Sequence, residues 1–217
     1  MSHSNIYPFK TKPYDHQREA WEISKDKTEY ALFMEMGTGK SKVAIDTFSY
    51  LYDKGAIDSV LIIAPKGVYM NWVNSELPAH VPDHIKTVIA NWAASPKKKE
   101  KLMLEKVTTT IHDLRILVMN VEAFSTARGM KYAKKFVELS NCMVIVDEST
   151  TIKNPTAMRT KNIIKVSVRA KYKRILTGEP VTRSPLDIYT QCQFLNPVIL
   201  GFSSYYSFRN RYAVMIP

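Results

Sequence analysis

The sequence is poor in cysteine, and no apolar run in it is long enough to cross a membrane. Its two cysteines, Cys142 and Cys192, form no C-x-x-C pair, which argues against a zinc or dithiol redox motif. A membrane-spanning helix needs about 20 apolar residues, and the N-terminal segment lacks the apolar stretch of a signal peptide. We therefore expect no membrane partner and a reducing compartment: the cytoplasm of a bacterium or of a virus-infected cell, or the nucleus in a eukaryote.

Acidic residues are also few for a chain this basic. Asp and Glu number 20 against 31 Lys and Arg, which gives a formal net charge of +11. Such an excess favours an anionic partner, and nucleic acid is the usual one, although a basic protein need not have such a partner. No repeat, low-complexity tract or linker divides the 217 residues, so we predict one domain over residues 1–217 and expect a monomer.

Short apolar runs alternate with longer amphipathic segments. Several runs are rich in Val and Ile, as strands buried on both faces are. The predicted strands are residues 30–34, 59–64, 85–90, 115–120, 142–147 and 172–177. Apolar residues at helical spacing follow Ser41 until Gly55, and the Ser-Pro pairs at 95–96 and 184–185 predict two further helix starts. The alternation predicts an α/β fold whose mostly parallel sheet carries helices on both faces.

The segment MEMGTGKS (34–41) ends like a phosphate-binding loop, but Met34 stands where the full pattern has its first glycine. In such a loop, backbone N–H groups and a helix N-terminus converge on phosphate oxygens, the lysine reaches the β- and γ-phosphates, and the hydroxyl binds Mg²⁺. Here Met34 falls at the end of the incoming strand, where its side chain can pack. The residues predicted to bind nucleotide in this loop are Gly37, Thr38, Gly39, Lys40 and Ser41.

A pair of acids, Asp147 and Glu148, follows four apolar residues and ends a predicted strand. Ligands of open α/β sheets bind at such carboxyl ends. We predict that Asp147 holds Mg²⁺ with Ser41, and that Glu148 polarises the attacking water. Two acids at a strand end are common on protein surfaces, so only their combination with the loop points to ATP and Mg²⁺, with Lys40, Asp147 and Glu148 as catalytic residues.

Six segments, in order, resemble the motifs of the superfamily-two helicases and translocases, in particular the Swi/Snf-like branch. They are YDHQREA (14–20), MEMGTGKS (34–41), LIIAPKGVYMNWVNSE (61–76), VMNVEAF (118–124), VIVDESTTIKNPTAMRTK (144–161) and RILTGEPVTRSPLDIYTQCQFLNP (174–197). The resemblance covers nearly the whole chain. It implies the first of two RecA-like ATPase domains of a motor that moves on nucleic acid, and it implies that Gln17 reads adenine.

The same resemblance places residues of three segments against nucleic acid, with duplex DNA as the expected partner. The candidate contacts are Lys66, Gly67, Asn71, Lys153 and Asn154. A solvated loop lysine is the alternative for Lys153, and Trp72 is expected in the core rather than as a stacking platform. The basic clusters at 97–101 and 169–174 are either solvated faces or further contacts, and Tyr7 or Phe9 either stacks on adenine or packs against the domain.

The chain departs from the family pattern in two motifs. The family's D-E-x-H is Asp147-Glu148-Ser149-Thr150 here. The missing His usually links the nucleotide site to the motif at 174–197, so we expect the Thr150 hydroxyl, with Thr177 and Gly178, to make that coupling. Glu179 replaces a Thr, and because an acid would repel phosphate, we expect it to face solvent or a basic residue.

The later family motifs, which belong to a second RecA-like domain, are not in this sequence. One of them supplies an arginine to the γ-phosphate, so we expect such a domain after Pro217 and predict weak ATP binding and poor hydrolysis by this chain alone. Two other functions stay open: a small-molecule kinase, which would normally keep the first loop glycine and an arginine-rich lid, and a nucleic-acid-binding module with a degenerate nucleotide site.

Overall fold

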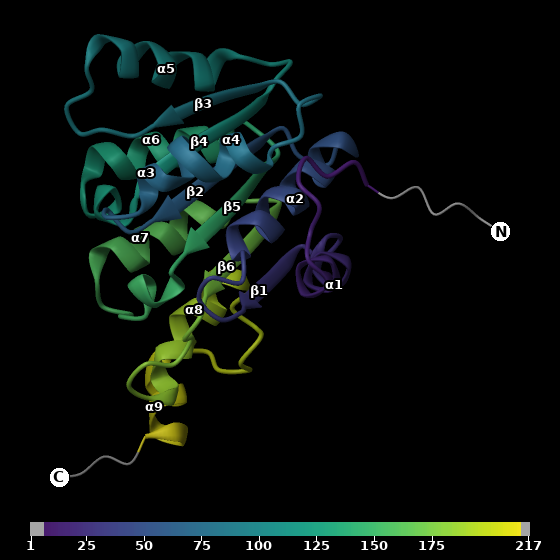
Figure 1. The fold of residues 1–217 in the computed structure, drawn as a ribbon. Helices are drawn as coiled ribbons and strands as arrows, with labels where there is room; N and C mark the ends of the chain where they lie inside the picture. The colour runs from purple at the N-terminus through teal and green to yellow at the C-terminus, as the bar shows by residue number, and fades with distance from the viewer. Residues whose placement is uncertain (1–6, 214–217) are drawn as a thin grey trace.

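The computed structural model describes residues 7–213, and its centre is a six-stranded parallel sheet (Figure 1). The strands are β1 (Glu29–Phe33), β2 (Ser59–Ala64), β3 (Thr87–Asn91), β4 (Leu114–Asn120), β5 (Cys142–Asp147) and β6 (Tyr172–Thr177). They lie in the order β1-β6-β5-β2-β4-β3, and every neighbouring pair is parallel. All six predicted strands are confirmed, with ends that differ by one or two residues at most.

Helices cover both faces of this sheet, as predicted. One face carries α1 (Asp15–Ser24), α2 (Lys40–Asp53) and the continuous helical segment formed by α3 (Tyr69–Asn71), the π-helix η1 (Trp72–Glu76) and α4 (Leu77–His80). The opposite face carries α5 (Lys98–Thr109), η2 (Val121–Ser125), α6 (Ala127–Glu138), α7 (Met158–Ser167) and α8 (Ile188–Leu195). Among residues 7–213, no helix combines the length and apolar character that a membrane span requires.

Three short elements complete the described chain. They are η3 (Ser149–Ile152), η4 (Pro185–Asp187) and α9 (Tyr205–Tyr212). Helix α9 extends beyond the end of the sheet that holds β1 and β6 (Figure 1). Its Phe208 is buried against the ring of Tyr189 on α8, with centroids 5.3 Å apart, so an aromatic contact holds this last helix to the domain.

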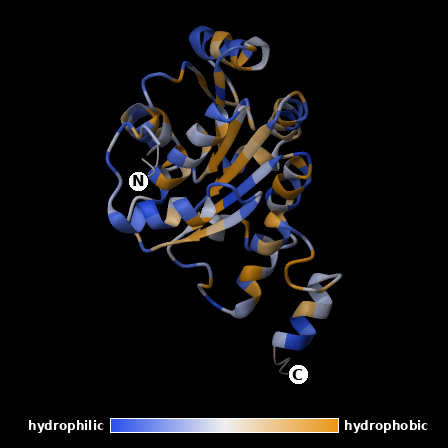
Figure 2. Ribbon diagram, turned by 90° about the vertical axis from the view of Figure 1, so that its right-hand side faces the viewer, coloured by the Kyte–Doolittle hydropathy of each residue, from blue (hydrophilic) through white to orange (hydrophobic). Residues whose placement is uncertain are grey.

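The core consists of two apolar layers, one on each face of the sheet. Successive residues of β2 alternate between them: Val60 and Ile62 face one layer, whereas Leu61 and Ile63 face the other. This explains why the central strands are continuous apolar runs rather than alternating ones. Figure 2 shows several strands of the sheet largely in orange, between helices in which blue and orange segments alternate. Cys142 is fully buried, as expected, and its burial raises the pKa of its thiol to about 12.

The two helix starts predicted from Ser-Pro pairs have different outcomes. The prediction that Ser95 and Pro96 open a helix is wrong, because α5 begins at Lys98 and a Glu100 carboxylate oxygen accepts the Lys97 backbone N–H at 2.7 Å. That carboxylate also offsets the repulsion between neighbouring lysines and the helix dipole. Ser184 does cap a start: its hydroxyl accepts the Leu186 N–H at 3.3 Å, but the first turn is 3₁₀ and α8 follows it.

Candidate nucleotide and nucleic-acid site

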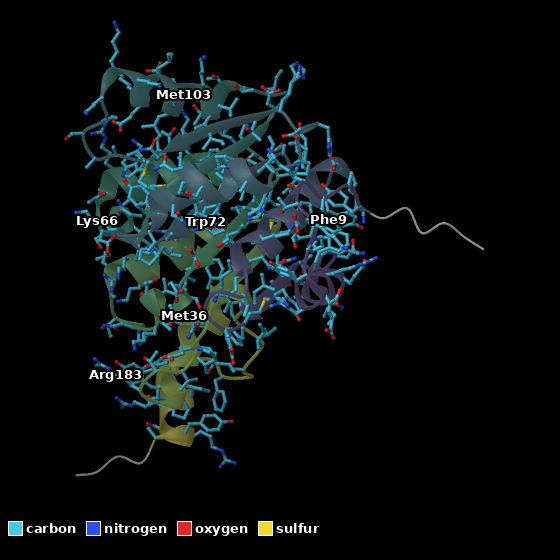
Figure 3. All side chains as sticks on the ribbon, in the orientation of Figure 1. Phe9, Met36, Lys66, Trp72, Met103 and Arg183 are labelled. Carbon is cyan, nitrogen blue, oxygen red and sulfur yellow. The ribbon has the colours of Figure 1, made fainter. Side chains whose placement is uncertain are left out.

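The strand order brings three motifs together at the carboxyl-terminal ends of neighbouring strands. Strand β6 lies between β1 and β5, and in the register Phe33 pairs with Thr177 while Asp147 pairs with Leu176. The phosphate loop that follows β1, the Thr177-Gly178 turn and the acid pair are therefore neighbours. Figure 3 labels Met36, within this loop, on the side toward which the strand arrows of Figure 1 point.

The two loop glycines adopt backbone conformations that other residues avoid. Gly37 has φ +77° and Gly39 has φ +83°, both left-handed, and Gly39 is the N-cap of α2. A Cβ atom on Gly39 would lie 2.3 Å from Nε2 of Gln17, inside van der Waals contact. Met34 lies directly after β1 and packs against the core, as predicted. The glycine that the full pattern lacks is thus replaced by a packing residue.

Lys40 is almost buried, and its ammonium group lies within the loop. Its Nζ donates to the backbone carbonyls of Met34 and Glu35, at 3.0 Å each. The Thr38 hydroxyl donates to the same Glu35 carbonyl at 2.7 Å. These acceptors are neutral dipoles, so a phosphate would offer the ammonium a stronger, charged partner. Ser41 is the second residue of α2 and therefore lies in the first turn of that helix.

Gln17 ties α1 to the phosphate loop. Its side chain is buried; its Oε1 accepts the Tyr14 N–H and its Nε2 donates to the Thr38 carbonyl, both at 3.0 Å. A ring nitrogen of His16 lies 3.0 Å from the same carbonyl. Beside these contacts runs an open groove of about 560 Å³, lined by α1, β1 and the loop, including His16 and Thr38.

The two aromatic residues considered for adenine stacking pack against the domain instead. Phe9 meets the Trp21 ring at 4.9 Å, and Tyr7 stacks near Trp21 while its hydroxyl donates to Asp53 at 2.8 Å. In Figure 3, Phe9 lies on the side opposite Met36. The exposed aromatic next to Gln17 is Tyr14, whose ring stacks on His16 at 5.9 Å. No adenine-stacking role was predicted for Tyr14, although it directly precedes α1.

The acid pair is held by hydrogen bonds at the end of β5. One carboxylate oxygen of Asp147 accepts the indole N–H of Trp72 at 2.8 Å, and the other accepts the Glu148 backbone N–H at 3.0 Å. Burial raises the pKa of Asp147 above its usual value, although these donors and Lys40 oppose the rise. Glu148 has φ +46°, which is unusual for a residue other than glycine; burial and the nearby Asp147 charge raise its pKa as well.

The turn after β6 contacts both the phosphate loop and Glu148. The Thr177 carbonyl accepts the Met34 N–H at 3.3 Å, and the buried Thr177 hydroxyl is one of the groups that lower the pKa of Glu148. A Cβ on Gly178 would lie 3.3 Å from the Met36 side chain, so this turn packs closely on the loop. Glu179 is exposed, in agreement with the expectation that it faces solvent.

A buried polar contact that the sequence analysis missed joins the acid motif to α8. The Ser149 hydroxyl donates to the Gln191 amide oxygen at 2.5 Å. The amide nitrogen of Gln191 donates to the carbonyls of Pro180 at 2.7 Å and Asp187 at 2.8 Å. Thr150, the residue expected to make the coupling, has no side-chain hydrogen bond among residues 7–213, so the observed link runs through its neighbour.

The candidate nucleic-acid contacts form two groups. Lys66, Gly67 and Asn71 are exposed between the end of β2 and η1, and Figure 3 shows Lys66 on the same side of the molecule as Met36. The Asn71 amide donates to Glu76 at 3.2 Å. Lys66 and Gly67 can meet a phosphate without unfolding any element, and Asn71 can do so by exchanging Glu76 for the phosphate.

The second group already has partners within its own loops. Lys153 donates to the Thr182 hydroxyl and lies 3.6 Å from the Asp187 carboxylate. The Asn154 side chain accepts the Thr156 N–H at 2.9 Å, which fixes a local turn. Burial would raise the pKa of Asp187, but N–H groups of Arg183 and Thr182 lower it to about 2. A phosphate would have to compete with this carboxylate for Lys153.

The basic cluster at 169–174 is not one continuous surface. Arg174 is fully buried, and its guanidinium donates to carbonyls at the end of α1 and beyond, among them Ser24 at 2.8 Å and Lys27 at 2.7 Å. Lys173 is half-buried and donates to the Leu195 carbonyl at 2.6 Å. Arg174 therefore fastens α1 to β6 and is no nucleic-acid contact, whereas the lysines at 97–99 and 101 stay exposed.

Comparison with known proteins identifies the family. The profile of the SNF2-related domain matches residues 14–216. A probable ATP-dependent DNA helicase of Arabidopsis thaliana is 29% identical over 168 residues, covering 77% of this chain and 14% of that protein. An uncharacterized ATP-dependent helicase of Mycoplasma pneumoniae is 30% identical over 169 residues, covering 77% and 15%. This chain thus spans about a seventh of the length of these relatives.

The fold also matches a solved structure. The Sulfolobus solfataricus SWI2/SNF2 ATPase core in complex with double-stranded DNA superposes with a TM-score of 0.74, at 22% identity, covering 98% of this chain and 41% of that one. The fold is RecA-like, with a six-stranded parallel sheet between flanking helices. This chain belongs to the SNF2-related family of superfamily-two helicases and is the N-terminal lobe of a Swi/Snf-type ATPase core. Both relatives named above are described as ATP-dependent helicases.

Proposed function

We propose that this lobe is the ATP-binding half of a motor that couples ATP hydrolysis to movement along duplex DNA. One observation carries the proposal: the phosphate loop, the acid pair and the Thr177-Gly178 turn occupy adjacent strand ends, and Lys66 is exposed at a further strand end of the same edge. A nucleotide and a nucleic acid can therefore bind side by side. That the Sulfolobus structure carries double-stranded DNA supports duplex DNA as the partner.

The nucleotide would bind along the loop, with adenine near Gln17 and Tyr14. Phosphate oxygens would replace the Met34 and Glu35 carbonyls as partners of Lys40, and the backbone N–H groups from Gly37 to Ser41 would complete the phosphate cradle. Glu148, whose raised pKa favours proton acceptance, would orient the attacking water. In this proposed binding mode, each residue of the phosphate loop takes a role that its position in the structure allows.

The residues at the acid pair fit a magnesium ion. Each oxygen of the Asp147 carboxylate accepts one N–H in the structure and so keeps a further lone pair for a metal-bound water. The Ser41 hydroxyl lies on the first turn of α2, where the family pattern has a metal ligand. When bound, Mg²⁺ would neutralise charge on the β- and γ-phosphates. Asp147 and Ser41 are the residues that we propose to hold it.

The second candidate function is a nucleic-acid-binding module with a degenerate nucleotide site. The observation that favours it is the altered acid motif, in which Ser149 and Thr150 replace the usual residues and Glu179 stands in the following turn. A kinase is less well supported, since the loop lacks the first glycine and belongs to a helicase-family sequence.

A nucleotide titration separates these functions. We expect Mg²⁺-ATP to bind to the wild-type chain, and Lys40→Ala to weaken binding at least tenfold, because one charge-assisted phosphate contact is lost. Lys54→Ala is the matched control: Lys54 follows α2 at its other end and forms an exposed ion pair with Asp26. Equal affinity of the wild type and Lys40→Ala would support the degenerate module. Stimulation of ATPase activity by duplex DNA, measured with the second domain present, excludes the kinase.

A further inference from the structure

One buried hydrogen bond connects the two halves of the proposed site. Trp72 is 1% exposed, and its indole N–H donates to an Asp147 carboxylate oxygen at 2.8 Å across 75 residues of sequence. The partner is a partly buried carboxylate, so this is a charge-assisted contact of the stronger kind. Trp72 therefore does more than fill the core: it fixes the orientation of the carboxylate that is proposed to hold Mg²⁺.

The residues around Trp72 lead directly to the exposed surface at the end of β2. The N–H groups of Val68 and Tyr69 both donate to the Pro65 carbonyl, at 3.0 and 2.9 Å, which fastens the helical segment to the turn that carries Lys66. Asn71 precedes Trp72 and is exposed. In Figure 3, Trp72 lies at the centre of the molecule and Lys66 at its edge. A ligand that displaces Lys66 or Asn71 therefore also displaces the helical segment that contains Trp72.

The helical segment that contains Trp72 has an unusual backbone geometry, which suits a segment that changes conformation. Residues 72–76 form a π-helix, which interrupts the α-helix between α3 and α4, and π-turns are frequent at functional sites. The Asn71 amide reaches across this turn to Glu76. Changes at Asn71 can thus reach Asp147 through the next residue, Trp72.

We infer that Trp72 is a positioning residue that transmits nucleic-acid binding at Lys66 and Asn71 to the Asp147 carboxylate. The inference rests on the proposed function, because it needs both a nucleotide and a nucleic acid at the sites described. It adds a specific connection: the helical segment 69–80 moves, the indole N–H moves with it, and the carboxylate turns toward or away from the metal. Coupling of this kind must be reciprocal, so nucleotide also changes the affinity for DNA.

The test measures this reciprocity in the chain itself. Affinity for a non-hydrolysable Mg²⁺-ATP analogue is titrated with and without a short DNA duplex. In the wild type we expect the duplex to change the dissociation constant by a factor of about 5 or more. In Trp72→Phe, which keeps an aromatic ring but removes the N–H donor, we expect that factor to fall to about 1, with duplex binding retained.

Trp92→Phe is the matched control. Trp92 is also buried, at 4% exposed, but it belongs to the apolar layer on the opposite face of the sheet. We expect this variant to keep the wild-type factor.

A second measurement protects the test against a variant that fails to fold. The chain has three tryptophans, so Trp21→Phe combined with Trp92→Phe leaves Trp72 as the only indole fluorophore. We expect its emission to shift when the Mg²⁺-nucleotide binds and to shift again when the duplex is added. Unchanged emission while both ligands bind, or a wild-type coupling factor in Trp72→Phe, overturns the inference. A wild-type chain that binds neither ligand overturns the proposed function itself.

Discussion

A substitution at Gly39 is expected to affect both the phosphate loop and the Gln17 side chain of α1. Its φ of +83° favours glycine, and a Cβ there would lie 2.3 Å from the Gln17 amide nitrogen. We expect Gly39→Ala to displace the Gln17 side chain from the Thr38 carbonyl and to weaken ATP binding by at least tenfold, or about 1.4 kcal/mol. Calorimetric titration with Mg²⁺-ATP measures the effect.

Gly55→Ala separates backbone strain from the contact with Gln17. Gly55 also has a left-handed backbone, with φ +66°, but a Cβ there would meet no atom within 4 Å. We expect this control to cost about 1 kcal/mol of unfolding free energy and to leave nucleotide affinity intact. Equal losses of affinity in both variants would show that strain alone, and not the Gln17 contact, matters at Gly39.

At this scale, local spacing allowed some residues to be predicted and not others. The loop glycines, Lys40 and the acid pair lie within short sequence patterns at strand ends, so their neighbourhood follows from the chain itself. The Trp72–Asp147 and Ser149–Gln191 contacts join residues 75 and 42 positions apart. They depend on which strands become neighbours, and no local pattern encodes that order.

Among the elements, α8 and the acid motif are joined by Gln191. Replacing Gln191 by Leu leaves the Ser149 hydroxyl and the Pro180 carbonyl without their buried partner, so we expect the unfolding free energy to fall by about 2 kcal/mol. Because Ser149→Ala removes one of these orphaned groups, the double variant should lose less than the sum of the single ones, by at least about 0.5 kcal/mol. Urea denaturation measures all three.

Gln193→Leu serves as the control on the same helix. Its amide makes one hydrogen bond, to the Tyr189 hydroxyl at 2.7 Å, and it is half-buried. We expect Gln193→Leu and Ser149→Ala to be additive. If Ser149→Ala and Gln191→Leu were additive too, α8 would not communicate with the acid motif through this contact.

Helix α2 contains a buried ion pair that makes its stability depend on pH. The Lys42 ammonium lies 2.7 Å from the Asp46 carboxylate, and the two side chains are 6% and 1% exposed. Burial raises the pKa of Asp46 to about 6, although Lys42 opposes the rise. The folded state therefore binds this proton more tightly than the unfolded state, and the stabilisation is fully present below about pH 4 and is lost as the pH rises through about 6.

The prediction concerns the difference between two proteins, which removes the titration of other groups. Relative to Asp46→Asn, the unfolding free energy of the wild type should fall by about 2 to 3 kcal/mol between about pH 4 and pH 6. Asp26→Asn gives the opposite sign, since hydrogen bonds from Lys54 and Tyr50 lower the pKa of the exposed Asp26. A difference between wild type and Asp46→Asn that stays flat over this range would contradict the prediction.

The sequence was sufficient to predict which helices and strands form. Their end residues, and which of their side chains are exposed, were less predictable. Short apolar runs identified all six strands, and several of these runs are rich in Val and Ile because the central strands are buried on both faces. The start of α5 was wrong by two residues, since a Ser-Pro pair outweighed the Glu100 side chain that caps the helix. Arg174 was misjudged as a surface cation because its partners, the carbonyls after α1, are about 150 residues away.

For the whole molecule, we predict slow ATP turnover by this lobe alone. The arginine expected to neutralise the γ-phosphate would belong to the second domain that the family resemblance implies, and arginines of this kind contribute on the order of 10³ to 10⁵ in rate. Joining the lobe to that domain should raise DNA-stimulated turnover by about 10³-fold or more, which a steady-state ATPase assay measures. Equal turnover by the lobe and by the two-domain protein would contradict this.

The position of β1 at the edge of the sheet has a consequence for the order of events during synthesis. Its hydrogen-bonded partner is β6, so residues 29–33 pair with residues 173–177, and Arg174 fastens α1 to the same strand. At about 5 to 20 residues per second, a ribosome needs roughly 7 to 30 seconds to deliver β6 after β1 has emerged. Strand β1 is the first strand to be synthesised, but it gains its neighbour in the sheet only when β6 has emerged. A nascent chain arrested before β6 should therefore not yet bind nucleotide.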